Sequence, residues 1–171
     1  MIEMNGKRAA LGFRRSQLLY DIENCSYIEG DILDREDYNT RRVIQDVGQR
    51  GNVDQVTRII DLCVSRCRER LYPFTKREVG DRPMVVEDVL ENERTYWITL
   101  SLPTGFSETT VEYLGKLIHE YIVCMVMYDW MSIVQPKKRE IWREKGDGLE
   151  DEIKRSLKGR TGKIRRSLHP F

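Results

Sequence analysis

The stretch SETTVEYLGKLIHEYIVCMVMYDWMSIVQP, residues 107–136, decides the fold. Ser107 suits a helix N-cap, Glu108 favours a first turn, and Pro136 ends the segment. Between them, one set of mostly apolar residues recurs every three or four positions and forms a stripe along the helix. Further apolar residues occupy the other faces. The stripe is Leu114, Leu117, Ile118, Tyr121, Ile122, Met125, Tyr128 and Ser132; the others are Val123, Cys124, Val126, Met127 and Trp130. A helix that is apolar nearly all round is buried, so we predict a central helix over 108–134.

The most apolar part of this stretch, YIVCMVMYDWMSIV, does not predict a membrane span. It contains Asp129 and follows Lys116, His119 and Glu120. It is also shorter than the roughly 20 residues that cross a bilayer. The N-terminal MIEMNGKRAALGF lacks the apolar core of a secretion signal.

Three helices are predicted before this one. The first covers 16–29 and ends at Gly30, and a mostly polar second runs from Asp34 to a stop at Gly51. The third, 52–71, is capped by Asn52, ended by Pro73 and clearly amphipathic. Its apolar face is Val53, Val56, Ile59, Ile60, Cys63, Val64, Cys67 and Leu71. We expect Ile122 and Met125 of the central helix to pack against Ile59, Ile60 and Val64 of this helix.

Residues 96–102 change the period from helix to strand. Tyr96, Ile98, Leu100 and Leu102 alternate with Trp97, Thr99 and Ser101. The predicted partner strand lies in 75–79 or 82–89, with Gly80, Asp81 and Pro83 as turn residues. A lone hairpin is marginal in water, so it must lie on the helices or pair with another chain. We therefore predict a subunit interface at Tyr96, Trp97, Thr99 and Ser101.

The C-terminal part reads as a charged helix from Pro136 to 158 with one apolar side. That side is Trp142, Leu149, Ile153 and Leu157, and Gly146 and Gly148 predict a kink or break. The chain then ends on RTGKIRRSLHPF, residues 160–171. Residues 154–171 carry seven basic residues and no acid, so residues 1–153 sum to −6 within a total of +1. Such segregation is typical of a folded body with an interaction tail.

Together these patterns predict one domain, mainly α: a helical bundle with a small β-hairpin insert and an extended C-terminal arm. The expected division is an N-terminal extension over 1–15, a helical domain over 16–158 with the β insert at about 74–103, and a basic arm over 159–171.

Reaction chemistry is not expected from this sequence. Cys63 and Cys67 are four apart, but no CxxC or neighbouring histidine accompanies them, so buried thiols without metal are the expectation for all four cysteines. His119 is read as a hydrogen-bonded core or boundary residue, and Glu150 and Asp151 as a solvated helix face. The GRTGK at 159–163 lacks the spacing and the Ser or Thr of a phosphate loop. We predict no catalytic residue, no cofactor and no enzyme.

The basic arm favours binding. Ile164, Leu168 and Phe171 are spaced four and three, as anchors would be. Arg160, Lys163, Arg165 and Arg166 lie among them and can pair with acids or phosphate. Three alternatives stay open: a frayed terminus without a partner, a nucleic-acid-binding module that uses the basic tail, and a cytosolic helical enzyme or regulatory domain, for which the sequence offers no site. Against the second, no helix shows a continuous Lys/Arg face.

The order of these elements resembles the small α-helical head-to-tail connector (adaptor) proteins of tailed bacteriophages. The likeness covers roughly residues 50–171 and rests on a Leu-Tyr-Pro corner (71–73), a strand-bearing insert and a Leu-Pro step (102–103). A capped helix with Tyr113, Tyr121 and Tyr128 follows, and then a charged helix with a Trp and a Leu/Ile stripe, closed by glycine.

The resemblance implies a structural virion component, assembled in the bacterial cytoplasm. It implies a homo-oligomeric ring, expected to be dodecameric, that docks on the portal protein. The docking residues would be Arg160, Lys163, Ile164, Arg165, Arg166, Leu168 and Phe171. Downstream tail or stopper proteins and genomic DNA in the lumen are further implied partners, and no membrane is.

Overall fold

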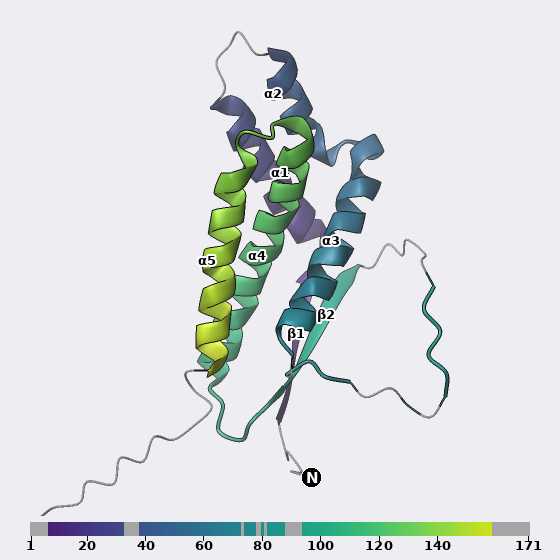
Figure 1. The fold of residues 1–171 in the computed structure, drawn as a ribbon, viewed down its shortest axis with the longest axis vertical. Coiled ribbons are helices and arrows are strands. Elements are labelled where there is room, and N and C mark those ends of the chain that lie inside the picture. The colour runs from purple at the N-terminus through teal and green to yellow at the C-terminus, as the bar shows by residue number, and fades with distance from the viewer. Residues whose placement is uncertain are drawn as a thin grey trace, which may run out of the picture.

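A computed structural model describes residues 7–32, 38–72, 74–77, 80, 82–87 and 94–158. The described chain is mainly α with one small two-stranded antiparallel sheet, which confirms the predicted fold class (Figure 1). The basic segment 159–171, with every predicted portal-docking residue, lies outside the described residues.

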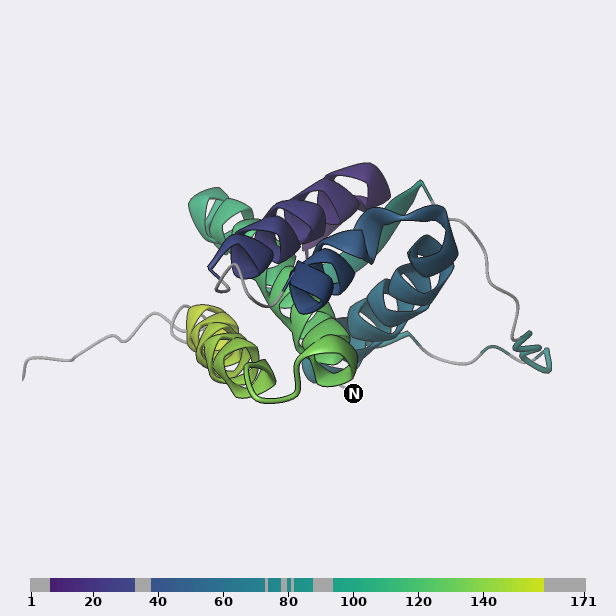
Figure 2. The same cartoon turned by 90° about the horizontal axis from the view of Figure 1, so that it is seen from above.

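The central helix is α4, Glu108–Val134, with the predicted bounds. Seen from above, it lies between α1, α3 and α5 (Figure 2). Ser107 is its N-cap, but the Ser107 carbonyl, not the hydroxyl, accepts from the amides of Thr110 and Val111. By length and composition alone α4 is sufficient to cross a membrane, contrary to the expectation, which counted only its most apolar run. Since 61% of that window is buried inside the protein, α4 has the surroundings of a core helix.

The other helices pack around α4. They are α1 (Arg15–Asp31), α2 (Tyr38–Gln45), α3 (Arg50–Arg70) and α5 (Arg139–Lys158), with a 3-10 turn at Asp46–Gly48. Polar contacts join them. The Trp130 indole of α4 donates to the Ile44 carbonyl at 3.1 Å in a buried bond, and the Arg15 guanidinium donates to the Thr57 hydroxyl at 2.7 Å in a partly buried one. These bonds fix α2 on α4 and α1 on α3.

The helix boundaries differ from prediction where α2 gives way to α3. Gly51 does not end a helix but lies in the first turn of α3, which begins at Arg50 with Gln49 as N-cap. Asn52 is therefore not the cap. Its side-chain amide donates instead to the Asp46 carbonyl at 2.8 Å, which ties the 3-10 turn to α3. Pro73, the predicted end signal, lies outside the described residues.

The predicted packing of α4 on α3 is half right. Ile122, Ile60 and Val64 are fully buried in the core, but Ile59 and Met125 are only partly buried. Met125 faces α5, where its sulfur would lie 3.2 Å from a Cβ placed on Gly146. Because α4 is apolar all round, its periodicity cannot say which face meets which neighbour.

The sheet pairs β1 (Lys7–Arg14) with β2 (Thr95–Leu102), in register from Lys7↔Leu102 to Arg14↔Thr95. The predicted partner for 96–102 is thus wrong, because the described residues between 74 and 87 form no strand. Likewise, residues 7–15 are not an extension: they are β1 and the start of α1. The alternation of Leu11 and Phe13 with Gly12 and Arg14 is the signal, weakened by small residues on the outer face.

Helix α5 runs unbroken through Gly146 and Gly148, so the predicted break is absent. Gly146 is buried where α5 crosses α4, beside Met125 and Cys124, and a hydrogen atom in place of a side chain allows this approach. Glu150 is also not solvated. It is 9% exposed and forms ion pairs with Arg70 of α3 and Lys154. The packing of α5 against its neighbours offsets the free-energy cost of placing two glycines inside a helix.

Candidate functional site

A groove of about 590 Å³ opens beside β1, between that strand, α1 and α4. Its lining combines backbone from β1 with polar side chains from the two helices. The lining residues are Ala10, Leu11, Gly12, Phe13, Gln17, Asp21, Glu112, Gly115, Lys116, His119 and Glu120. Gly115 leaves space next to Leu11, whose methyl carbon would lie 3.6 Å from a Cβ at that position.

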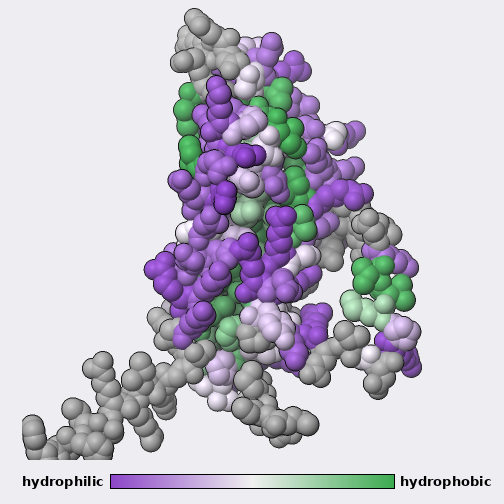
Figure 3. Space-filling view, in the orientation of Figure 1, coloured by the Kyte–Doolittle hydropathy of each residue, from purple (hydrophilic) through white to green (hydrophobic). Residues whose placement is uncertain are grey.

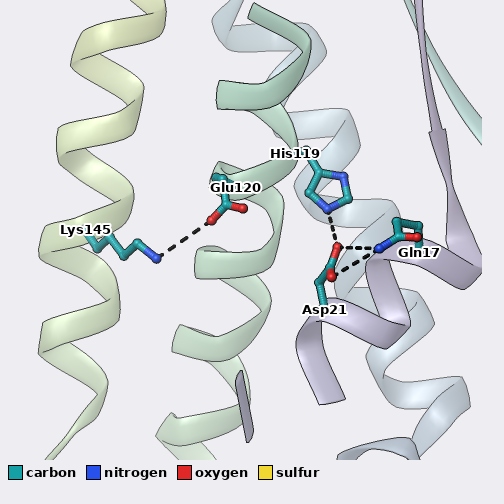
Figure 4. Close-up of polar contacts among 5 residues, drawn as sticks. All are labelled: Gln17, Asp21, His119, Glu120 and Lys145. Atoms are coloured by element: carbon teal, nitrogen blue, oxygen red, sulfur yellow. Dashed lines mark hydrogen bonds and ion pairs between the residues drawn. The ribbon is translucent and has the colours of Figure 1, made fainter. Parts of the chain in front are cut away.

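A small polar network forms one wall of the groove (Figure 4). His119 Nε2 lies 2.8 Å from Asp21 Oδ2, and the Gln17 amide donates to both Asp21 oxygens at 3.1 and 3.2 Å. On the other side of α4, Glu120 points toward Lys145 of α5, at 3.8 Å. His119 is thus a hydrogen-bonded boundary residue that joins α4 to α1, as the sequence indicated.

This network lacks the partner that nucleophilic catalysis needs. Among the described residues, His119 has one recorded hydrogen bond, to the Asp21 carboxylate, and no hydroxyl or thiol accompanies it. Burial raises the pKa of Cys25 on α1, and raises that of Cys124 to about 11. Neither thiol is therefore a ready thiolate nucleophile near neutral pH. No cluster of three or more potential metal ligands occurs in the described part of the chain.

The strand that borders the groove has an open edge. The ladder continues one residue beyond β1, where the Arg15 amide donates to the Arg94 carbonyl at 3.0 Å. Hydrogen-bonded pairs alternate along an antiparallel ladder, so the backbone of Arg8, Ala10 and Gly12 points away from β2. Within the described residues, no hydrogen bond is recorded for the amides or carbonyls of these three positions.

The outer edge of β2 is partly occupied by its own chain. The Arg68 guanidinium donates to the Trp97 carbonyl at 2.9 Å, and the Ser101 amide donates to the Phe74 carbonyl at 2.8 Å. Thr99, between them, has an outward backbone with no recorded bond. The β1 edge therefore offers a longer free stretch than the β2 edge.

The four predicted interface residues do not share one face. Tyr96 is 3% exposed and lies in the core, so its side chain cannot meet a neighbouring subunit. Trp97, Thr99 and Ser101 lie on the opposite face of the sheet, and Trp97 is 53% exposed. A Cβ on Gly12 would fall 2.8 Å from the Trp97 ring, so the indole covers that glycine across the strands.

The most exposed apolar group lies where the sequence predicted a paired strand. Met84, Val85 and Val86 are 71%, 77% and 79% exposed on the connection between α3 and β2. They form an isolated hydrophobic patch on a loop that stands clear of the body (Figure 3). The signal was available, since three consecutive apolar residues after Pro83 were read as a strand that would pair within the chain.

The fold and the groove together define a class: a helical domain with a small sheet, whose prominent surface features are an open strand edge and an exposed apolar segment. An open strand edge has unpaired backbone groups that can accept a further strand, and an exposed apolar segment favours burial against another surface. No family model, no curated protein and no solved structure matches this chain.

Proposed function

We propose that this protein is a structural subunit of a head-to-tail connector (adaptor) ring in a tailed phage or prophage particle. The observation that carries the proposal is the exposed apolar segment Met84–Val86 on an otherwise well-packed helical domain. Contiguous apolar side chains in water favour association, because burial in an interface removes their surface from solvent.

The order of elements supports the connector assignment over a generic binding domain. An amphipathic helix, a long insert with a strand, a capped apolar helix and a charged helix follow one another, and a basic C-terminal arm comes last. In this proposal copies of the chain form the ring, expected to be dodecameric, and the arm docks on the portal protein. Tail or stopper proteins follow, and DNA passes through the lumen. The virion is the site of function, and no reaction is catalysed.

The outer face of the sheet is the proposed contact between neighbouring subunits. Trp97, with Thr99 and Ser101 beside it, offers an exposed aromatic surface of the kind enriched at interfaces. The arm residues that would reach the portal are Ile164, Leu168 and Phe171 as apolar anchors, with Arg160, Lys163, Arg165 and Arg166 as charged partners.

Native mass spectrometry and negative-stain imaging of the purified full chain test the proposal. A closed ring of defined copy number is the expected result. A monomer at micromolar concentration that binds DNA with strong salt dependence would replace the connector with the nucleic-acid-binding alternative, since phosphate contacts weaken steeply with salt.

A further inference from the structure

We propose that the segment Arg82–Glu87 of one copy adds as a third strand to the open edge of β1 in the next copy. The segment would lie along the groove between β1, α1 and α4. The inference rests on the proposed ring, because it assigns the contact that joins neighbouring subunits. Strand addition of this kind uses main-chain hydrogen bonds for affinity and alternate side chains for specificity.

The donor segment is suited to a strand. Pro83 is followed by Met84, Val85 and Val86, two of them β-branched, and the described residues 82–87 adopt neither helix nor strand in the isolated chain. All three apolar side chains are more than two-thirds exposed. As a strand, Met84 and Val86 would face one side and Val85 the other, so both faces need cover.

The acceptor edge provides what such a strand requires. Arg8, Ala10 and Gly12 present backbone amides and carbonyls away from β2, at the edge where the groove opens. Inside the groove, one face of the added strand would cover Leu11, beside the space left by Gly115. On the outer face, the other side would approach the exposed indole of Trp97, which lies across Gly12.

Donor and acceptor lie at opposite edges of the sheet. The connection that carries Met84–Val86 leaves α3 beside β2, where the Phe74 carbonyl accepts from Ser101. The open acceptor edge belongs to β1. A contact between two different surfaces is head-to-tail, and repeated head-to-tail contacts form a ring when the rotation between copies closes and an open filament when it does not. This arrangement therefore favours a second copy as the occupant of the groove.

Two substitutions test the two halves of the contact. Val85→Asp places a charge in the donor, and Ile141→Asp, on the exposed surface of α5, is its matched control. Ala10→Pro removes an outward amide without breaking the β1–β2 ladder, and Ala10→Ser keeps that amide. Native mass spectrometry should give monomers for Val85→Asp and Ala10→Pro and intact rings for both controls.

The register supplies a further comparison, since Thr99 lies opposite Ala10. Thr99→Pro removes the corresponding outward amide of β2 and should weaken assembly less than Ala10→Pro. Mixing the Val85→Asp and Ala10→Pro chains should give a heterodimer of one copy each, because only one competent contact can form. Circular dichroism and melting verify that each variant is folded, and Val85 lies outside the core.

A peptide of residues 80–89 separates this inference from the proposed function. Added to the full-length Val85→Asp chain, it should slow hydrogen exchange at the Ala10 and Gly12 amides, and the same peptide with Val85→Asp should not. If both Val85→Asp and Ala10→Pro still form rings, or if only Thr99→Pro loses them, the inferred contact is wrong. The proposed ring would then stand with a different subunit contact. If the wild-type chain is monomeric, the proposed function falls. The peptide experiment then tests the inference by itself. Slower hydrogen exchange at the Ala10 and Gly12 amides supports pairing of the segment with β1, and unchanged exchange overturns it.

Discussion

Single residues show how burial sets the cost of a change. Ile60 is fully buried where α3 meets α4, whereas Met125 is only partly buried against α5. Ile60→Ala should lower the free energy of unfolding by about 2–5 kcal/mol, because it leaves a cavity that the core cannot fill. Met125→Ala should cost less than Ile60→Ala, since a flexible and only partly buried side chain loses less contact on truncation. Urea denaturation measures both, and equal costs would contradict this placement of Met125.

The buried thiols predict a loss of stability in alkali. Burial raises the pKa of Cys63 and of Cys67 from 9.0 to about 12. The unfolded chain releases these protons above pH 9 while the folded protein keeps them, so stability is fully present below pH 9 and falls as the pH rises toward 12. At about pH 10 each thiol should account for a loss of about 1 kcal/mol.

Urea unfolding of Cys67→Ala at pH 8 and at pH 10 checks this expectation. The variant should show a smaller drop between the two pH values than the wild type, whatever its stability at pH 8. Cys25→Ala is the matched control, because Cys25 is only half-buried and its substitution should relieve less of the drop. An identical drop in all three proteins would argue against the thiols as its source.

Among the elements, α5 contains two glycines that test packing and intrinsic helix preference separately. Gly148 has open space around the position of a Cβ, whereas Gly146 faces the Met125 sulfur. Gly148→Ala should stabilise the protein by about 0.5–1 kcal/mol, because alanine is the better helix former. Gly146→Ala should stabilise less, and Gly146→Leu should destabilise, because a large side chain would force α5 away from α4.

Thermal melting of the three glycine variants measures the order of their stabilities directly. A gain for Gly146→Ala as large as that for Gly148→Ala would mean that Met125 moves aside without cost. None of the three substitutions removes a partner of the ion pairs that Glu150 forms with Arg70 and Lys154 further along α5.

At the scale of the whole molecule, the prediction concerns the basic arm. Deleting residues 160–171 should leave circular dichroism and melting nearly unchanged, because a short segment with four Lys or Arg residues, Gly162 and Pro170 cannot build a core. In the proposed connector, the same deletion should abolish binding to the portal, since Ile164, Leu168 and Phe171 would supply the apolar anchors. Pull-down with portal protein and particle assembly are the measurements.

Point substitutions refine the role of the arm. Phe171→Ala should weaken portal binding more than Lys163→Ala, because an anchor buried in a pocket contributes more than a charge at a rim. Raising the salt concentration should weaken only the charge-dependent part. Unfolding of the truncated chain would place the arm in the core of the domain, and normal particle assembly would leave it without a docking role.

The sequence by itself determined the elements whose patterns are local. The bounds of α4 follow from an apolar run between Ser107 and Pro136, and the two faces of β2 follow from strict alternation between Tyr96 and Leu102. A periodicity of 3.6 or 2 residues can be recognised from residues close together in the sequence. These predictions therefore needed no tertiary information.

Only the tertiary structure decided which elements meet. It paired β2 with β1, about 80 residues earlier in the chain, directed Met125 toward α5, and kept α5 unbroken through Gly146. It also left Met84–Val86 exposed and the edge of β1 open, which together define the candidate interface. Such partners are chosen by the burial of surface and the completion of hydrogen bonds between distant segments, and these free energies exist only when the chain has folded.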